Sequence, residues 1–401
     1  MKRKLASALI LTALLAATIA HAADWPRFLG PDGTGIAPDT GINKNWAQRP
    51  PRVLWQVGMS DDGYAGPSAA DGKVFIIDHQ GQEDVVRALD AATGTDLWGA
   101  RYPDPGAPDN GFARSTPCFA GGRLYTLGRA GQLFCLNAAD GRLLWAKSLQ
   151  RDFGGQVPTW KYAMSPIIDG DRLVVVPGGP NATVAVLDKL TGSTIWAGGG
   201  SFPAGYSTPV VATINDVKQY VVFAGNALIG VRADNGQLLW QVPWATQHGV
   251  NAALPIVDGN FVFATSGYGF GCGVVEVLAN GAQAVWGAKS MQAHFSSPIY
   301  YKQHIFGTTD PGDLVCLEGQ EGKALWRQGG FEKGGIVIVD DTIIALSGGD
   351  GTLVMAAAAT DAYHELGRLK PLGGQSWTAP IVADGKLIIR NKAALACLDL
   401  M

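Results

Sequence analysis

The chain has 401 residues, of which 47% are hydrophobic and 16% are charged, and its formal net charge is −3 at pH 7. This balance is typical of a compact globular protein. Beyond the first four residues no Lys/Arg-rich run occurs, so the sequence lacks the electrostatic surface that nucleic acid requires, and we expect no nucleic-acid partner.

The N-terminus has the pattern of a secretory signal peptide. Lys2, Arg3 and Lys4 precede an apolar run over residues 5–19, and Ala20-His21-Ala22 offers small residues at a cleavage site. We therefore predict a signal peptide over residues 1–22, cleavage near Ala22, and a periplasmic or secreted protein. The apolar run is too short for a membrane span, and because no cysteine stands at the cleavage site we expect no lipid anchor.

Residues 23–50 are rich in glycine and proline and show no hydrophobic alternation. Such a stretch is typical of an extended segment without regular secondary structure. We predict that it lies on the surface of the following domain, with Trp25, Phe28 and Trp46 as anchors.

From residue 51 onward the chain is built from a repeat, whose clearest copy is Ala88 to Trp98 (ALDAATGTDLW). It predicts two strands joined by a tight turn, in which Gly94 takes a backbone conformation with positive φ. Close copies occupy residues 135–145, 186–196 and 316–326. The repeats place a tryptophan at Trp55, Trp98, Trp145, Trp196, Trp240, Trp286 and Trp326.

A second marker, a small or polar residue followed by proline, recurs in phase with the tryptophans. The prolines are Pro67, Pro117, Pro166, Pro209, Pro255, Pro298 and Pro380, and a unit near residues 334–338 lacks one. Each marker is followed by a glycine turn and a β-rich run, which gives four strands in roughly 40 to 50 residues, the size of a propeller blade. Eight units begin, but the last ends at Asp399 before its fourth strand.

The strand around Trp55 can supply that missing element. We therefore predict an all-β, eight-bladed β-propeller of four-stranded antiparallel blades over residues 51–401, with the ring closed by an N-terminal strand. We expect a monomer. The regular recurrence of the seven tryptophans predicts a structural role for them, docking between adjacent blades, rather than a ligand platform.

The motif A-x-D-x-x-T-G-x-x-x-W, carried by Ala88, Asp90, Thr93, Gly94 and Trp98, resembles the tryptophan-docking motif of the PQQ-type (quinoprotein) propeller repeat. The opening W-P-R-F-L-G-P-D-G-T-G resembles the N-terminus of exported PQQ-like propeller proteins. The resemblance implies two kinds of function. Catalytic members hold pyrroloquinoline quinone and calcium in the ring centre, use a catalytic aspartate and often carry a disulfide between adjacent cysteines. Non-catalytic members, the BamB-like propellers of outer-membrane protein assembly, act as scaffolds for partner proteins.

This chain has no adjacent cysteine pair, and no position matches a calcium-ligand set or a catalytic aspartate. We predict no catalytic residue, no metal and no cofactor.

The loops that precede the proline markers converge on one mouth of the central channel in a propeller. They carry aromatic and basic side chains, which suit an anionic or planar ligand or a peptide. The candidate ligand-binding residues are Tyr64, Arg114, Trp160, Lys161, Tyr162, Tyr206, His248, Asn251, His294, Lys333, Gln375 and Trp377. Phe112, Phe295 and Glu332 occupy the same loops.

The sequence thus favours a non-catalytic binding or scaffold propeller of the cell envelope, which engages a protein partner or a small ligand at the channel mouth. Two alternatives remain open at this point. One is a PQQ-dependent dehydrogenase that uses pyrroloquinoline quinone and calcium, and the other is a carbohydrate-binding propeller.

Overall fold

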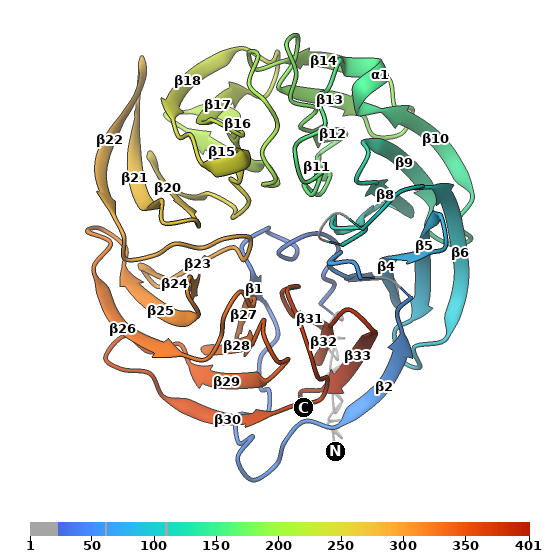
Figure 1. Ribbon diagram of the computed structural model, residues 1–401, viewed down its shortest axis with the longest axis vertical. Helices are drawn as coiled ribbons and strands as arrows, with labels where there is room; N and C mark the ends of the chain where they lie inside the picture. Colours follow the sequence, from blue (N-terminus) through green and yellow to red (C-terminus); the bar gives the residue numbers. More distant parts are fainter. Residues whose placement is uncertain (1–22, 61, 109–110) are drawn as a thin grey trace, which may run out of the picture.

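The computed structural model describes residues 23–60, 62–108 and 111–401, and the predicted signal peptide lies outside these ranges. Eight β-sheets are arranged around a central axis (Figure 1). In the described ranges the helices are α1 (Leu149–Phe153) and a 3-10 turn at Gln247–Gly249, and none is long and apolar enough to cross a membrane. The predicted eight-bladed, all-β propeller is confirmed.

Each blade is an antiparallel sheet whose strands follow one another from the centre of the ring outward. The first four blades contain β3 (Ser68–Ala70), β4 (Lys73–Gln80), β5 (Glu83–Asp90), β6 (Asp96–Pro103); β7 (Cys118–Ala120), β8 (Arg123–Leu127), β9 (Gln132–Asn137), β10 (Leu143–Ser148); β11 (Ile167–Asp169), β12 (Arg172–Val175), β13 (Val184–Asp188), β14 (Thr194–Gly198); and β15 (Val210–Ile214), β16 (Val217–Phe223), β17 (Ala227–Arg232), β18 (Leu238–Pro243).

The next three blades follow the same plan. They contain β19 (Ile256–Asp258), β20 (Phe261–Ser266), β21 (Gly271–Leu278), β22 (Gly281–Ala288); β23 (Ile299–Tyr301), β24 (His304–Thr309), β25 (Asp313–Glu318), β26 (Ala324–Gly329); and β27 (Ile336–Val339), β28 (Thr342–Leu346), β29 (Leu353–Ala357), β30 (Glu365–Leu369).

The eighth blade joins the two ends of the chain. It contains β31 (Ile381–Ala383), β32 (Lys386–Arg390), β33 (Ala394–Asp399) and, as its outermost strand, β2 (Val53–Gly58). β2 runs antiparallel to β33 and places Trp55 opposite Cys397. The predicted closure of the ring by an N-terminal strand is therefore confirmed, and it covers the edge that β33 would otherwise expose.

The blades form because turn residues and buried strands alternate at short intervals. In the first blade Asp71 and Gly72 both have positive φ, 54° and 69°, and join β3 to β4 in a tight hairpin. The middle strands β4 and β5 are buried on both faces, whereas the outer strand β6 alternates between exposed and partly covered residues. The core of the ring therefore lies in the inner three strands of each blade.

The N-terminal segment does not lie on the surface as predicted, because its first part runs through the centre of the ring (Figure 1). The backbone of Trp25 exchanges two hydrogen bonds with Ala69 of β3, and the amide of Phe119 in β7 donates to the carbonyl of Pro26. β1 (Ile36–Ala37) then pairs in parallel with β27, as a fifth strand of the seventh blade. The innermost strands have open edges in the channel, and this segment satisfies part of their backbone hydrogen-bonding capacity.

The rest of the segment leads to the ring-closing strand. The amide of Gly41 donates to Asp340 Oδ2 between β27 and β28, and the amide of Asn43 donates to the carbonyl of Leu400. Trp46 is then 1% exposed and packs against the backbone at Gly367 of β30. Trp25 is also 1% exposed, so both tryptophans anchor the segment, although one does so inside the channel.

The interblade tryptophans share a geometry with two parts, an N–H bond and a covered glycine, and four of the seven show both. Five indole N–H groups donate to a backbone carbonyl in a turn of the next blade: Trp55 to Ala91, Trp98 to Ala138, Trp145 to Lys189, Trp196 to Ala233 and Trp326 to Ala359. Four of the same rings, those of Trp55, Trp98, Trp145 and Trp196, cover a turn glycine of the next blade, and so does the ring of Trp286. A Cβ added to the glycine would lie within 2.7 Å of the indole in each case, at Gly94, Gly141, Gly192, Gly236 and Gly322.

Trp240 and Trp286 depart from this rule in different ways. Trp286 covers its glycine, but its buried N–H has no hydrogen-bond partner among the residues described. Trp240 instead donates to Gln219 Oε1 within its own blade, at 2.7 Å. The reason is local, because only Ala279 and Asn280 separate β21 from β22, and this short turn replaces the longer T-G turn that receives the tryptophan elsewhere.

Candidate functional site

A cavity of about 310 Å³ lies at the end of the channel where the innermost strands begin. Of the twelve candidate ligand-binding residues, seven line it: Tyr64, Arg114, Trp160, Tyr206, His294, Lys333 and Trp377. The N-terminal segment adds Trp25, Phe28 and Leu29 to the wall. The cavity is therefore the predicted channel mouth, with a contribution from the chain inside the channel that the repeat pattern does not reveal.

Aromatic rings form a continuous arc along one side of the cavity. Tyr64 stacks on Trp377 with 5.0 Å between ring centroids, and Trp377 lies 5.0 Å from Phe295. Phe295 in turn lies 5.0 Å from His294, whose ring meets Tyr268 edge-on at 4.5 Å. The arc joins loops of the first, eighth, sixth and fifth blades, and it skips the seventh, in which Gly334 and Gly335 replace the proline marker. It presents several aromatic faces and edges to one cavity.

The charge of the mouth is positive. The Lys333 ammonium lies 5.7 Å from the ring centroid of Trp377 and 6.0 Å from that of Phe295, within the range of cation–π attraction. Arg114 lines the cavity as well, and its Nη2 donates to the carbonyl of Gly111. The described residues that line the cavity include no carboxylate. An anionic group with an attached apolar or aromatic surface suits this wall best.

The serines and threonines of the proline markers also line the cavity. Ser165 Oγ accepts from the amide of Thr116, and Thr208 Oγ1 accepts from the amide of Ser165, each at 2.8 Å. Ser297 Oγ accepts from the amide of Leu254 in the same way, at 3.0 Å. Each bond joins one blade to the next, which explains why a small hydroxyl residue recurs before the prolines. The sequence shows this repetition, but not that the hydroxyls face the channel.

The other five candidates do not line the cavity. Tyr162 is buried and donates to the carbonyl of Pro177, and the Asn251 amide is buried in bonds to the carbonyls of Ala224 and Trp244. Lys161 and His248 have positive φ, 66° and 56°, and neither lines the cavity, although their loops contribute Trp160 and Val250 to it. His248 is exposed and meets the edge of Trp160. Gln375 supports the wall from behind, because its Oε1 accepts from the Tyr64 hydroxyl at 3.1 Å.

His294 stays neutral in this wall. Its side chain is 8% exposed, and burial, reinforced by the nearby Lys333 ammonium, lowers the pKa of His294 to about 4. The folded chain then binds fewer protons at this site than the unfolded chain between about pH 4 and pH 6.5. Stability from this group is present above pH 6.5 and is lost as the pH falls towards 4.

We expect that loss to reach at most about 3 kcal/mol. Urea unfolding at pH 7.5 and at pH 4.5 should therefore show a smaller difference in stability for His294→Leu than for the unchanged chain. His248→Leu, at an exposed histidine, is the matched control and should keep the pH dependence of the unchanged chain. Equal pH dependence in all three proteins would contradict the buried, neutral state of His294.

The residues of the mouth do not fit the calcium ion that accompanies pyrroloquinoline quinone in catalytic propellers. Calcium takes six to eight oxygen ligands, with carboxylates prominent among them. The described lining offers hydroxyl groups and two cationic side chains, but no carboxylate. The chemistry of the donor set gives no basis for a metal-assisted step at this position.

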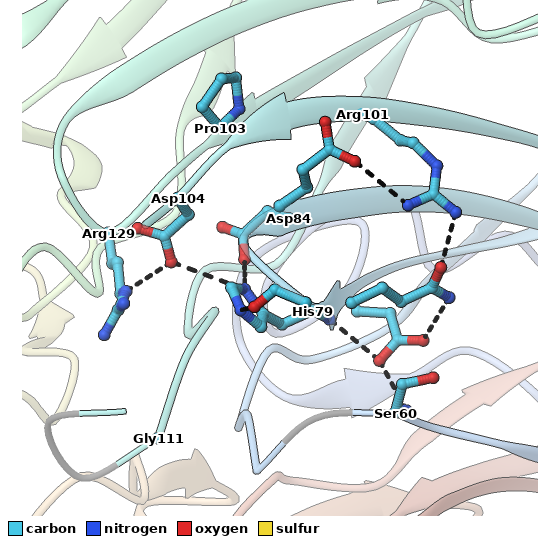
Figure 2. Close-up of polar contacts among 12 residues, drawn as sticks. Ser60, His79, Asp84, Arg101, Pro103, Asp104, Gly111 and Arg129 are labelled. Atoms are coloured by element: carbon cyan, nitrogen blue, oxygen red, sulfur yellow. Dashed lines mark hydrogen bonds and ion pairs between the residues drawn. The ribbon is translucent and has the colours of Figure 1, made fainter. Parts of the chain in front are cut away.

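A separate polar cluster lies in the first two blades (Figure 2). His79 Nδ1 is 2.9 Å from Asp84 Oδ1 and 3.7 Å from Asp104 Oδ2, and Arg129 Nε donates to Asp104 Oδ2 at 2.6 Å. All four side chains are buried, and burial raises the pKa of Asp84 to about 6. Sequence reasoning missed this cluster, because hairpin register and a long loop bring its members together and no motif spacing marks them.

The amino-acid sequence of the chain is similar to those of known proteins. A family model described as outer membrane protein assembly factor BamB matches residues 82–328, more than half of the chain. BamB of Shewanella oneidensis is 24% identical over 275 residues, which cover 62% of this chain and 65% of that protein. The chain thus spans just under two thirds of that relative's length. BamB of Moranella endobia is 22% identical over 329 residues, which cover 75% of this chain and 70% of that protein.

Solved structures share the fold at low identity. BamB from Moraxella catarrhalis superposes with a TM-score of 0.63 and 14% identity, covering 87% of this chain and 99% of that one. The quinohemoprotein alcohol dehydrogenase ADHIIG from Pseudomonas putida HK5 gives a TM-score of 0.69 and 14% identity, covering 94% of this chain and 80% of that one. At this identity the likeness concerns the fold alone, and it extends to an alcohol dehydrogenase as well as to BamB.

The eight blades, the tryptophans between them and the repeat motif define a PQQ-like β-propeller. Within that class, the chain belongs to the outer membrane protein assembly factor BamB family.

Proposed function

We propose that this chain is a non-catalytic binding and scaffold protein of the cell envelope, which engages an anionic ligand or protein segment at the channel mouth. The family membership supports a scaffold role, since its relatives are named as factors of outer membrane protein assembly. The predicted signal peptide supports a location in the envelope.

One observation carries the binding part of the proposal, namely the aromatic arc with the Lys333 ammonium above Trp377 and Phe295. The rings supply an apolar stacking surface, and the cation supplies charge-assisted hydrogen bonds to a carboxylate or phosphate. Because no carboxylate stands in the described lining, a cationic ligand would find no counter-charge there. The shared chemistry is an anion attached to an aromatic or apolar group, whether on a small molecule or on a peptide.

Calorimetric titration with 2-naphthoate and with its neutral analogue 2-naphthalenemethanol tests this chemistry. We expect the carboxylate to bind and Lys333→Met to weaken it about tenfold to a hundredfold, the effect of losing a hydrogen bond to a charged group. Trp377→Ala should weaken the carboxylate and the alcohol alike. Lys392→Met is the matched control, because Lys392 lies over Tyr64 at 5.8 Å but does not line the cavity. Equal affinity for the two compounds would contradict an anion site.

Further titrations distinguish a peptide ligand from a small molecule and test the two alternative functions. If an acidic peptide with aromatic residues competes with naphthoate, the natural ligand is a protein segment. If a neutral oligosaccharide competes, the result favours a carbohydrate-binding propeller. Pyrroloquinoline quinone is titrated with and without calcium, and dye reduction is then assayed with simple alcohols and sugars. Calcium-dependent binding with turnover would replace the proposal with a quinone-dependent dehydrogenase.

A further inference from the structure

We propose that His79, Asp84 and Asp104 form a structural site for a first-row divalent cation, with Zn²⁺ as the best match. His79 ends the buried part of β4 and lies directly opposite Asp84 in the β4–β5 hairpin register, and Asp104 follows the outer strand β6. One imidazole and two carboxylates are a ligand set that zinc accepts. This site is distinct from the channel mouth and does not depend on the binding function proposed for it.

The distances suit coordination. In a tetrahedral site with metal–ligand bonds near 2.1 Å, two ligand atoms lie about 3.4 Å apart. The separations of His79 Nδ1 from Asp84 Oδ1 and from Asp104 Oδ2, 2.9 Å and 3.7 Å, lie on either side of that value. The donor atoms of the three residues all lie within 4.8 Å of one another. Small side-chain rotations are therefore sufficient to surround one ion.

The outer partners hold these ligands in the way that metal sites require. His79 Nε2 is 3.0 Å from the carbonyl of Gly81, so a proton on Nε2 donates there. Nδ1 donates to Asp84 Oδ1 at 2.9 Å, and a bound cation would take the place of that Nδ1 proton. Arg129 holds Asp104 through Nε, and its Nη1 donates to the carbonyl of Ala107. A backbone carbonyl behind the histidine and a hydrogen-bonded carboxylate are the usual second partners of metal ligands.

Two buried oxygens at the cluster point to a missing partner. Asp84 Oδ2 and the Tyr102 hydroxyl have no hydrogen-bond partner among the residues the structure describes, and Tyr102 is only 6% exposed. The electrostatic interactions of the Tyr102 hydroxyl are with Asp84 and Asp104, so both unpartnered oxygens belong to this cluster. A cation coordinated by Asp84 would give Oδ2 the partner that it lacks.

The site would stabilise one wall of the channel mouth. The Phe112 ring stacks on His79 with 3.6 Å between centroids, and the Arg129 guanidinium lies 4.8 Å from the same ring. Phe112 belongs to the loop between β6 and β7, which carries Arg114 into the cavity wall. A bound ion thus ties a hairpin of the first blade to this loop and, through Arg129, to the second blade.

The test is the rise in melting temperature caused by Zn²⁺ in chelator-treated protein, with the zinc content measured by mass spectrometry. Anything that binds the folded chain alone raises its melting temperature. We expect one zinc per chain and a clear rise for the unchanged protein, and none for His79→Gln, Asp84→Asn or Asp104→Asn. Comparing each variant with and without zinc removes any change in its intrinsic stability, and three variants guard against one that fails to fold.

His364→Ala provides the matched control, because His364 Nε2 pairs with Asp361 at 3.1 Å on the exposed surface, and no second carboxylate of the described residues pairs with it. This variant should keep the full zinc effect. No rise in the unchanged chain would overturn the proposal and assign the cluster to a proton-balanced ion network. A rise that persists in the three ligand variants would place zinc elsewhere, and an equal rise with Ca²⁺ would overturn the assignment to a first-row ion.

Discussion

A chain that begins at residue 59 is expected to lose most of its cooperative unfolding transition, compared with a chain that begins at residue 23. The shortened chain lacks β2, so the backbone groups of β33 lose their partners and the eighth blade loses its outer strand. It also lacks Trp55, whose ring covers Gly94 and whose N–H donates to Ala91 of the first blade. Loss of a large buried aromatic side chain alone costs about 3–5 kcal/mol, a large part of typical domain stability of about 5–15 kcal/mol.

A chain that begins at residue 43 separates closure of the ring from filling of the channel. It keeps β2 and Trp55 but lacks Trp25 and β1, and we expect a lower melting temperature with the cooperative transition retained. Differential scanning calorimetry of the three chains gives both the midpoint and the sharpness of unfolding. If the chains that begin at residues 43 and 59 unfold alike, the closing strand adds nothing, and the ring is stabilised from its centre.

The parts of the fold that can be predicted from the sequence are those whose residues recur in every repeat. The proline markers, the T-G turns and the tryptophans act over a few residues, so their recurrence is sufficient to predict the eight blades. Even the missing fourth strand of the last blade is predictable, because a count of units leaves Trp55 without a blade of its own. For the same reason the convergence of Arg114, Lys333 and Trp377 on one mouth follows from their shared position in the repeat.

The parts that do not follow depend on contacts between distant and irregular segments. Residues 25–37 show no periodicity, and they lie in the channel because their backbone pairs with the open edges of β3, β7 and β27. Within the loops, a single residue with positive φ, such as Lys161, changes where its neighbours point. The His79 cluster needs both the register of one hairpin and the path of the next loop, neither of which has a signature in residue spacing.

The tryptophans offer the sharpest test of what joins the blades. Trp145→Ala is expected to lower the free energy of unfolding by about 3–5 kcal/mol, because the indole leaves a large gap between the second and third blades. The ring covers Gly192, where an added Cβ would lie 2.7 Å from Cδ2, and its N–H donates to Lys189 at 3.2 Å. Urea denaturation followed by circular dichroism measures the difference. A loss below 1 kcal/mol would mean that the blades are held together mainly elsewhere.

Replacement by phenylalanine separates the ring from its hydrogen bond. Trp326→Phe removes an N–H that donates to Ala359 at 2.9 Å, and should lose about 1 kcal/mol more than the change of ring size alone accounts for. Trp286→Phe is the control within the same fold, since its indole also reaches a turn of the next blade, at Gly322, but its buried N–H has no partner among the described residues. Removing that N–H takes away an unsatisfied polar group, so this variant should lose less than Trp326→Phe. Equal losses at both positions would show that the indole contributes through packing alone, and that the carbonyl of the next blade serves only to orient it.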